Sequence, residues 1–310
     1  MIKSCKKYVK NFLCLALVCF IALLSSCRTV SAVALVGGFL GEMAGIEGSA
    51  DIALSIADSA ESIEKAMEDF TPEQEYYIGR AVAASILAKY DLYDSPSLER
   101  YLNQICAALI ITSDVPTLYK GYSVGILDTD EINAFATSGG HIMVSRGLIK
   151  CATSEDALAA VLAHEIAHIQ SQHSLDAIQT SRITDAITKT GYATMNVLSK
   201  GELLEFTDTF GDVVDDIIGE MVDSGYSKTQ EFEADEKALS IMAKAGYYPK
   251  AMEDMLFVLK EKSNAQTGWG KTHPSPKERI KNLENLYKKY SVEDFRESRQ
   301  ARFLEATKDI

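Results

Sequence analysis

The sequence predicts an α+β fold that is mainly helical, with a small β-sheet beside one alanine-rich helix. Three observations lead to this expectation: helical periodicity over most of the chain, a short β-prone region at 121–149, and a return to helical periodicity at 153–173. The chain has 310 residues, of which 47% are hydrophobic and 24% are charged, so it can bury a full core. A globular protein of one or two domains is expected.

The first 26 residues have the composition of a signal peptide. A lysine-rich start at 1–10 precedes a run that is apolar apart from Asn11, and this run is too short to cross a bilayer comfortably. Residues 24–27, LSSC, resemble the lipobox of bacterial lipoproteins, in which the cysteine is acylated after cleavage. An uncleaved anchor or an ordinary signal peptide is the alternative. We therefore expect a lipid-anchored protein of the bacterial cell envelope, attached to the membrane through Cys27 and facing the periplasm.

Cleavage before Cys27 would make an acidic chain more acidic. Residues 1–26 contain four lysines and no acidic residue, so their removal changes the net charge from −13 to −17. Nucleic acid requires clusters of basic residues, so we expect no nucleic-acid partner. Anionic headgroups would also repel such a chain, which makes a covalent lipid anchor more useful.

The chain is expected to divide into four parts. These are a signal peptide at 1–26, a lipidated tether with an amphipathic helix at 27–70, a main domain at 71–290 and a charged C-terminal tail at 291–310. The main domain opens with helices at 71–90 and 95–113, and each begins with a hydroxyl residue followed by proline, which suits an N-cap and the first helical position. Further helices are expected at 228–246, 249–264 and 277–290.

The β-prone region at 121–149 is divided by the turn sequences DTDE and SGG, so we expect two or three short strands. Helical periodicity resumes after it. Ser154 can cap the next helix, and Glu155 and Asp156 in its first turn suit the helix dipole.

Two cysteines, Cys106 and Cys151, remain when the signal peptide and Cys27 are set aside. They could pair in an oxidising compartment, and two buried free thiols are the alternative. They are not a zinc pair, because no Cys-x-x-Cys spacing accompanies them.

The segment VLAHEIAHIQSQH at 161–173 contains three of the five histidines in the chain. On an α-helix His164 and His168, four positions apart, project from one face and can hold one metal ion. Glu165 lies beside this pair, where its carboxylate can take a proton from a zinc-bound water without binding the metal. The alternative is a core helix with hydrogen-bonded histidines, but such groups are costly to bury without a partner.

A catalytic zinc site needs a third protein ligand, and His173 is a poor candidate. Continued helical geometry points His173 roughly opposite His164, so we expect it behind the ligands or on the surface. In QEFEAD, Glu231 and Asp235 again stand four positions apart on a helix. One of them can bind zinc while the other accepts the N–H of a ligand imidazole.

Four blocks together resemble the M48 zinc metallopeptidases, the group of the HtpX, BepA-like and CAAX prenyl proteases. They are NAFATSGGHIMVSRGLI at 133–149, HEIAH at 164–168, YSKTQEFEAD at 226–235 and THPSPKERI at 272–280. The resemblance covers residues from about 72 to 290, and the four blocks together are highly specific. The chain departs from the family pattern at Ser138, where proline is frequent, and at Lys228, where arginine is usual.

The resemblance implies a zincin-like metallopeptidase domain with its small sheet beside the H-E-x-x-H helix, and one Zn²⁺ per chain. At the matching positions, the zinc ligands would be His164, His168 and Glu231. Glu165 would be the catalytic base, and Asp235 would orient a ligand imidazole.

In zincins an edge strand over the active-site helix pairs with the substrate backbone. The residues that match this element, and are expected to contact substrate, are Asn133, Ala134, Phe135, Gly139 and Gly140. For the two glycines, which would allow close backbone approach, a plain hairpin turn is the alternative.

His273 lies in the loop GWGKTHPSP, which in relatives can cover the active site. A catalytic His273 would donate to the oxyanion of the tetrahedral intermediate, and in a resting state it would occupy the open zinc position. The alternative is a loop histidine that stabilises a turn. We expect His141, on a strand, to be structural.

The favoured function is that of a lipid-anchored zinc endopeptidase that cleaves cell-envelope proteins, in protein quality control. A chaperone-like module that binds envelope proteins with little proteolysis is the alternative, and the complete ligand set disfavours a purely structural lipoprotein. The lack of several membrane spans argues against the integral-membrane branches of the family and against prenylated substrates. The substrate, the cleavage preference and the oligomeric state stay open.

Overall fold

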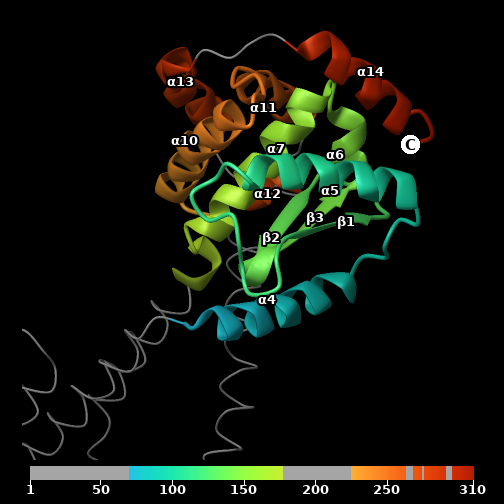
Figure 1. Ribbon diagram of the computed structural model, residues 1–310, viewed down its shortest axis with the longest axis vertical. Coiled ribbons are helices and arrows are strands. Elements are labelled where there is room, and N and C mark those ends of the chain that lie inside the picture. Colours follow the sequence, from blue (N-terminus) through green and yellow to red (C-terminus); the bar gives the residue numbers. More distant parts are fainter. Residues whose placement is uncertain (1–69, 177–224, 263–267, 274–275, 291–294) are drawn as a thin grey trace, which may run out of the picture. The chain divides into compact units, whose positions relative to one another are not determined.

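The computed structural model describes five stretches of the chain, which are residues 70–176, 225–262, 268–273, 276–290 and 295–310. The expected signal peptide, the lipidation site Cys27 and the tether up to residue 69 lie outside them. The described part consists mostly of helices around a small sheet, so the expected α+β, mainly helical fold is confirmed (Figure 1). Within these stretches, none of the helices has the length and apolar character that a membrane span requires.

The first two described helices begin as the sequence predicts, with one difference. Helix α4 (Pro72–Leu87) has a capping box, in which the Thr71 hydroxyl accepts from the Gln74 N–H at 3.3 Å and the Gln74 side chain accepts from the Thr71 N–H at 2.9 Å. Helix α5 (Pro96–Ile110) also begins with proline. Ser95 occupies the predicted N-cap position, but its side chain makes no capping hydrogen bond.

The region 121–149 contains three strands, which confirms the expected small sheet. They are β1 (Ser123–Leu127), β2 (Ala134–Thr137) and β3 (His141–Ser145). The order is β1-β3-β2, with β3 parallel to β1 and antiparallel to β2. The turn Ser138–Gly140 joins β2 to β3 and places Gly139 and Gly140 at φ 76° and 96°, where side chains other than hydrogen are strained.

The sheet lies between two layers of helices. Ala134 and Ala136 of β2 belong to the apolar cluster that contains the buried faces of α5 and α7 (Glu155–Gln170). Phe135, between them, belongs to the cluster that contains the buried face of α4. Alternate residues of the strand therefore face α4 on one side and the H-E-x-x-H helix on the other (Figure 1).

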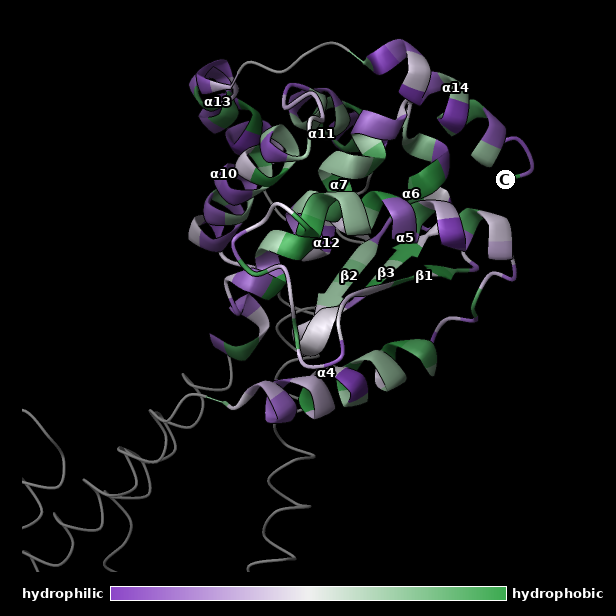
Figure 2. Cartoon of the chain, in the orientation of Figure 1, coloured by the Kyte–Doolittle hydropathy of each residue, from purple (hydrophilic) through white to green (hydrophobic). Residues whose placement is uncertain are grey.

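Helix α7 runs through the centre of the described structure. Ser154 caps it by accepting from the Ala157 N–H at 3.1 Å, as expected, and every residue except Gln170 is buried. Figure 2 shows it as one of the most apolar helices. Its many alanines allow neighbouring helices to pack closely, and side chains of neighbouring helices supply polar partners to Glu155 and Asp156 in its first turn.

The remaining helices surround α7. They are α6 (Arg146–Cys151), α10 (Lys228–Lys244), α11 (Ala251–Lys262), α12 (Trp269–Thr272), α13 (Pro276–Leu286) and α14 (Arg296–Ala306). Helix α14 lies in the segment expected to be a charged tail, so part of that segment is ordered helix. Cys106 on α5 and Cys151 on α6 are both free and buried, and burial raises the pKa of the Cys106 thiol to about 12.

Candidate metal centre

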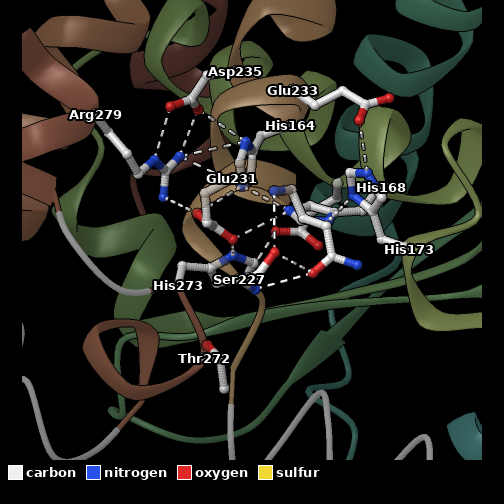
Figure 3. Close-up of polar contacts among 12 residues, drawn as sticks. His164, His168, His173, Ser227, Glu231, Glu233, Asp235, Thr272, His273 and Arg279 are labelled. Atoms are coloured by element: carbon white, nitrogen blue, oxygen red, sulfur yellow. Dashed lines mark hydrogen bonds and ion pairs between the residues drawn. The ribbon is translucent and has the colours of Figure 1, made fainter. Parts of the chain in front are cut away.

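Helices α7 and α10 lie side by side and bring three predicted metal ligands together (Figure 3). His164 and His168, one turn apart on α7, have their Nε2 atoms 3.1 Å from each other. Glu231 of α10 faces both, with Oε2 3.6 Å from His164 Nε2 and Oε1 3.4 Å from His168 Nε2. The i, i+4 spacing on α7 therefore produces one cluster of inward-facing donor atoms.

His273, at the end of α12, joins the same cluster. Its Nδ1 lies 3.0 Å from Glu231 Oε1, and its ring stacks on Trp269, with ring centres 4.1 Å apart. One donor atom from each of His164, His168, Glu231 and His273 lies within 4.8 Å of all the others, and all four residues are buried. Such a cluster of nitrogen and carboxylate oxygen donors can hold a metal ion.

Asp235 contacts His164 at Nδ1, the ring nitrogen that points away from the cluster. A residue that orients the imidazole of a metal ligand, as predicted for Asp235, requires this contact. Its Oδ1 lies 3.1 Å from His164 Nδ1, while His164 Nε2 faces the cluster. A carboxylate in this position fixes the proton on Nδ1 and leaves Nε2 free to bind metal.

Glu165 is buried beside the cluster, and its carboxylate has no polar partner at hydrogen-bond distance. Oε1 lies 3.6 Å from His273 Nε2, and neither oxygen makes a hydrogen bond to any described residue. Burial raises the pKa of this carboxyl group. Buried polar atoms are almost always satisfied, so the site fits a ligand, water or ion that Glu165 can contact.

Arg279 of α13 is a site residue that the sequence interpretation missed. It donates to both oxygens of Asp235, at 2.8 and 2.6 Å, and its Nη1 lies 2.6 Å from Glu231 Oε2. It is completely buried. Its position within the quoted block THPSPKERI was the available signal, because a buried pair of carboxylates needs a cation.

The electrostatics of the cluster depend on Arg279. Burial opposes the charged form of Glu231, but the Arg279 guanidinium and the contacts with His273, His164 and His168 together overcome this opposition and hold the pKa of Glu231 well below its usual range. Burial and the same guanidinium lower the pKa of His164, yet its contacts with the Asp235 and Glu231 carboxylates, together with the negative charge of Glu231, outweigh both and raise that pKa to about 9. Burial holds the pKa of His168 well below its usual range.

The predicted direction of His173 is wrong. Helix α7 ends at Gln170, and Gln172 adopts a positive φ of 56°, so the chain turns before His173. His173 is buried, and its Nδ1 lies 2.9 Å from His168 Nδ1. The prediction assumed that α7 continues through His173, which gave this side chain the wrong direction. Its position behind the ligand His168 is nevertheless one of the two positions expected from the sequence.

The model of Peptidase family M48 matches residues 96–287, which is more than half of the chain. The chain belongs to this family. One relative is the beta-barrel assembly-enhancing protease of Escherichia coli K12, 24% identical over 245 residues, or 76% of this chain and 49% of the relative. Another is the mitochondrial metalloendopeptidase OMA1 of Schizosaccharomyces pombe, 29% identical over 188 residues, or 59% of this chain and 51% of the relative.

The chain thus spans about half the length of these curated relatives. A third, the mitochondrial metalloendopeptidase OMA1 of Bos taurus, is 26% identical over 56% of this chain and 34% of its own length. The recognition of an M48, BepA-like chain from its four sequence blocks is confirmed. Family membership and the names of the relatives support a metallopeptidase.

The structure places the M48-like block at 133–149 beside the metal centre, but it uses the two glycines in packing. An added Cβ at Gly139 would lie 2.5 Å from the Tyr76 Cα, and one at Gly140 would lie 2.4 Å from the Gly121 carbonyl oxygen. Their close backbone approach is therefore to the chain itself. Contact with substrate stays a prediction for all five residues of this set, Asn133, Ala134, Phe135, Gly139 and Gly140.

Asn133 links this block to the His273 segment. Its side-chain Oδ1 accepts from the Thr272 hydroxyl at 3.1 Å, and the Ile132 carbonyl accepts from the Trp269 N–H at 2.7 Å. The start of β2 thus positions α12 and, through it, His273. Sequence reasoning had no signal for this contact, because the residues are more than 130 positions apart.

Lys228 and His141 both lie outside the metal centre. Lys228, where arginine is usual in the family, pairs with Glu278 at 2.8 Å, and both side chains are about half exposed. The departure therefore leaves the ligand cluster unchanged. His141 lies at the start of β3, where its Nδ1 is 3.5 Å from the Ser123 hydroxyl.

Proposed function

We propose that this M48 chain is a lipid-anchored, zinc-dependent metalloendopeptidase that hydrolyses peptide bonds of cell-envelope proteins in protein quality control. One observation carries the proposal: His164, His168 and Glu231 converge on a point beside a buried glutamate that has no hydrogen bond to any described residue. A core helix with satisfied histidines would have given Glu165 a partner.

The donor set favours zinc as the metal. Two imidazole nitrogens and one carboxylate are the protein ligands of a common class of catalytic zinc site, which keeps a further position open. Bound zinc supplies Lewis acidity that lowers the pKa of a water toward neutrality. Asp235 fixes the tautomer of His164, and Arg279 pairs with both carboxylates, Glu231 and Asp235, and offsets one of their two negative charges.

Glu165 is the proposed general base. Because burial raises its pKa, the carboxylate is better matched to a proton transfer near neutral pH than an exposed glutamate. It takes a proton from the water whose oxygen attacks the peptide carbonyl carbon. It then gives that proton to the amine nitrogen as the C–N bond breaks, so that Glu165 is regenerated.

The substrate class and location rest on less direct support. The LSSC segment at 24–27 is typical of a lipidated cysteine, and one group of relatives carries the name beta-barrel assembly-enhancing protease. Both favour a role at the bacterial cell envelope, facing the periplasm. The metalloendopeptidase names of other relatives favour protein or peptide substrates.

Metal analysis and a casein-cleavage assay on the purified protein test the proposal. We expect one zinc per chain, cleavage that stops when a chelator removes the metal, and recovery when zinc is restored. Zinc-free protein that cleaves casein at the same rate would contradict it.

We further propose that His273 takes the open metal position in a resting state of the protein. Its Nδ1 lies 3.0 Å from Glu231 and its Nε2 3.6 Å from Glu165, and its side chain is buried. If wild-type protein holds zinc yet cleaves nothing, His273→Ala should switch proteolysis on.

Continued inactivity of that variant would favour the chaperone-like binding module. A wild type that is active and loses activity in His273→Ala would favour the catalytic role, in which His273 donates to the oxyanion.

A further inference from the structure

The two histidines of the metal centre differ in what contacts their outward nitrogens. His164 has the Asp235 carboxylate at its Nδ1. No carboxylate of the described residues makes the same contact with His168, whose Nδ1 instead lies 2.9 Å from the Nδ1 of His173. Two ring nitrogens at this distance share one hydrogen, so one ring must donate and the other accept.

The inward nitrogen of His168 decides which ring donates. His168 Nε2 faces His164 and Glu231, at 3.1 and 3.4 Å, and is the atom available to a metal. A neutral imidazole that binds metal through Nε2 carries its proton on Nδ1. His168 is therefore the donor, and His173 accepts with an unprotonated Nδ1 and carries its own proton on Nε2.

The surroundings of His173 agree with this tautomer. Its Nε2 lies 3.6 Å from Oε2 of Glu233, which projects from α10 away from the metal ligand Glu231 (Figure 3). A negative charge on that side favours the proton on Nε2. The carboxylate, more than half exposed, stands at the outer end of a chain of contacts that begins at the buried His168.

The backbone places His173 by an uncommon conformation. Among the described residues Gln172 is the only one other than glycine with a positive φ, and helix resumes at His173 directly after it. The Gln172 carbonyl accepts from the N–H groups of Leu175 and Asp176, at 2.8 and 3.2 Å. Left-handed conformations of such residues cost free energy and are concentrated at functional sites, so the turn that places His173 against His168 fits a functional role for this contact.

We propose that His173 is a positioning residue for the metal ligand His168: it accepts the Nδ1 proton and so fixes the ring with Nε2 toward the metal. Glu233 in turn favours the required tautomer of His173. This inference rests on the proposed zinc site and gives His168 the kind of partner that Asp235 gives His164. Tyr226, stacked on His168 with ring centres 4.0 Å apart, restrains the plane of the same ring.

Zinc affinity of the full chain, measured by competition with a chromogenic chelator, tests the proposal. His173→Leu removes the acceptor and should weaken zinc binding by about 10- to 100-fold, the usual effect of losing such a partner. His173→Asn places an amide oxygen near the position of Nδ1 and should retain most of the affinity. His141→Leu is the matched control, a histidine outside the site, and should leave zinc binding unchanged.

A second measurement needs no variant. NMR spectra of zinc-loaded wild type labelled with ¹⁵N-histidine report the protonation of each imidazole nitrogen, and the chain has five histidines to assign. We expect His173 to show an unprotonated Nδ1 and a protonated Nε2. A proton on His173 Nδ1, or a folded His173→Leu variant with wild-type zinc affinity, would overturn the inference and leave the zinc site intact. Wild type that binds no zinc would overturn the proposed function together with this inference.

Discussion

Arg279 is the buried cation that both carboxylates of the site share. It pairs with Asp235 through two hydrogen bonds and with Glu231 at 2.6 Å, and all three side chains are buried. Burying two carboxylates without a cation is expensive, and removing one partner of a buried ion pair costs about 3–5 kcal/mol. The folded state therefore depends on this arginine even before a metal binds.

We predict that Arg279→Leu lowers the free energy of unfolding of the metal-free protein by about 3–5 kcal/mol. Urea denaturation in the presence of a chelator measures this change. Lys228→Met removes an exposed ion pair with Glu278 and should cost no more than about 1 kcal/mol. Equal stability of wild type and Arg279→Leu would show that the pairing contributes nothing net.

The sequence predicted those site residues whose relative positions follow from the spacing within a single helix. His164 and His168 converge because helical spacing determines it, and Glu231 and Asp235 reach them from one face of α10. Arg279 and the direction of His173 could not be predicted in the same way. The position of Arg279 depends on packing between α13 and α10. The direction of His173 depends on the end of α7 at Gln170, three residues before it.

The first turn of α7 is held by helix α14, far away in the sequence. Arg299 donates to both oxygens of Asp156, at 2.8 and 3.0 Å, and both side chains are nearly inaccessible. Arg302 pairs with the neighbouring Glu155 but is 60% exposed. Glu155 also accepts the hydroxyls of two tyrosines, Tyr101 and Tyr247, at 3.1 and 3.2 Å.

These contacts predict unequal effects for the two arginines. Arg299→Ala leaves a buried, charged Asp156 and should lower the free energy of unfolding by about 3–5 kcal/mol. Arg302→Ala should cost clearly less, because solvent screens that arginine and the tyrosines still satisfy Glu155. Thermal denaturation of both variants measures the difference, and an equal loss would contradict the argument.

Helices with strong end signals could be predicted from sequence, whereas α14 could not. Proline at the first position and a hydroxyl before it located α4 closely. In α14 only Arg299 and Phe303 are buried, so no apolar periodicity reveals it. Its helix is stabilised by partners more than 140 positions away, which local sequence does not contain.

For the whole molecule, the predicted lipid anchor determines where the metal centre would act. If Cys27 is acylated, Cys27→Ala should release the protein into the soluble fraction or leave its precursor uncleaved. Cell fractionation and mass spectrometry of the mature chain measure this. Unchanged mass and membrane association of the variant would indicate a transmembrane anchor instead of a lipid.

Glu165 is proposed to act as a general base beside a zinc ion that it does not bind. The direct test introduces Glu165→Gln into a parent protein that cleaves casein, which is either the wild type or the His273→Ala variant. Zinc content and casein cleavage are then measured for the parent and for the Glu165→Gln variant. Zinc content should stay at one per chain while cleavage falls by about 10²–10⁴-fold, the usual contribution of such a base. His164→Ala should lose both zinc and activity. Casein cleavage by Glu165→Gln at the rate of its parent would contradict the claim.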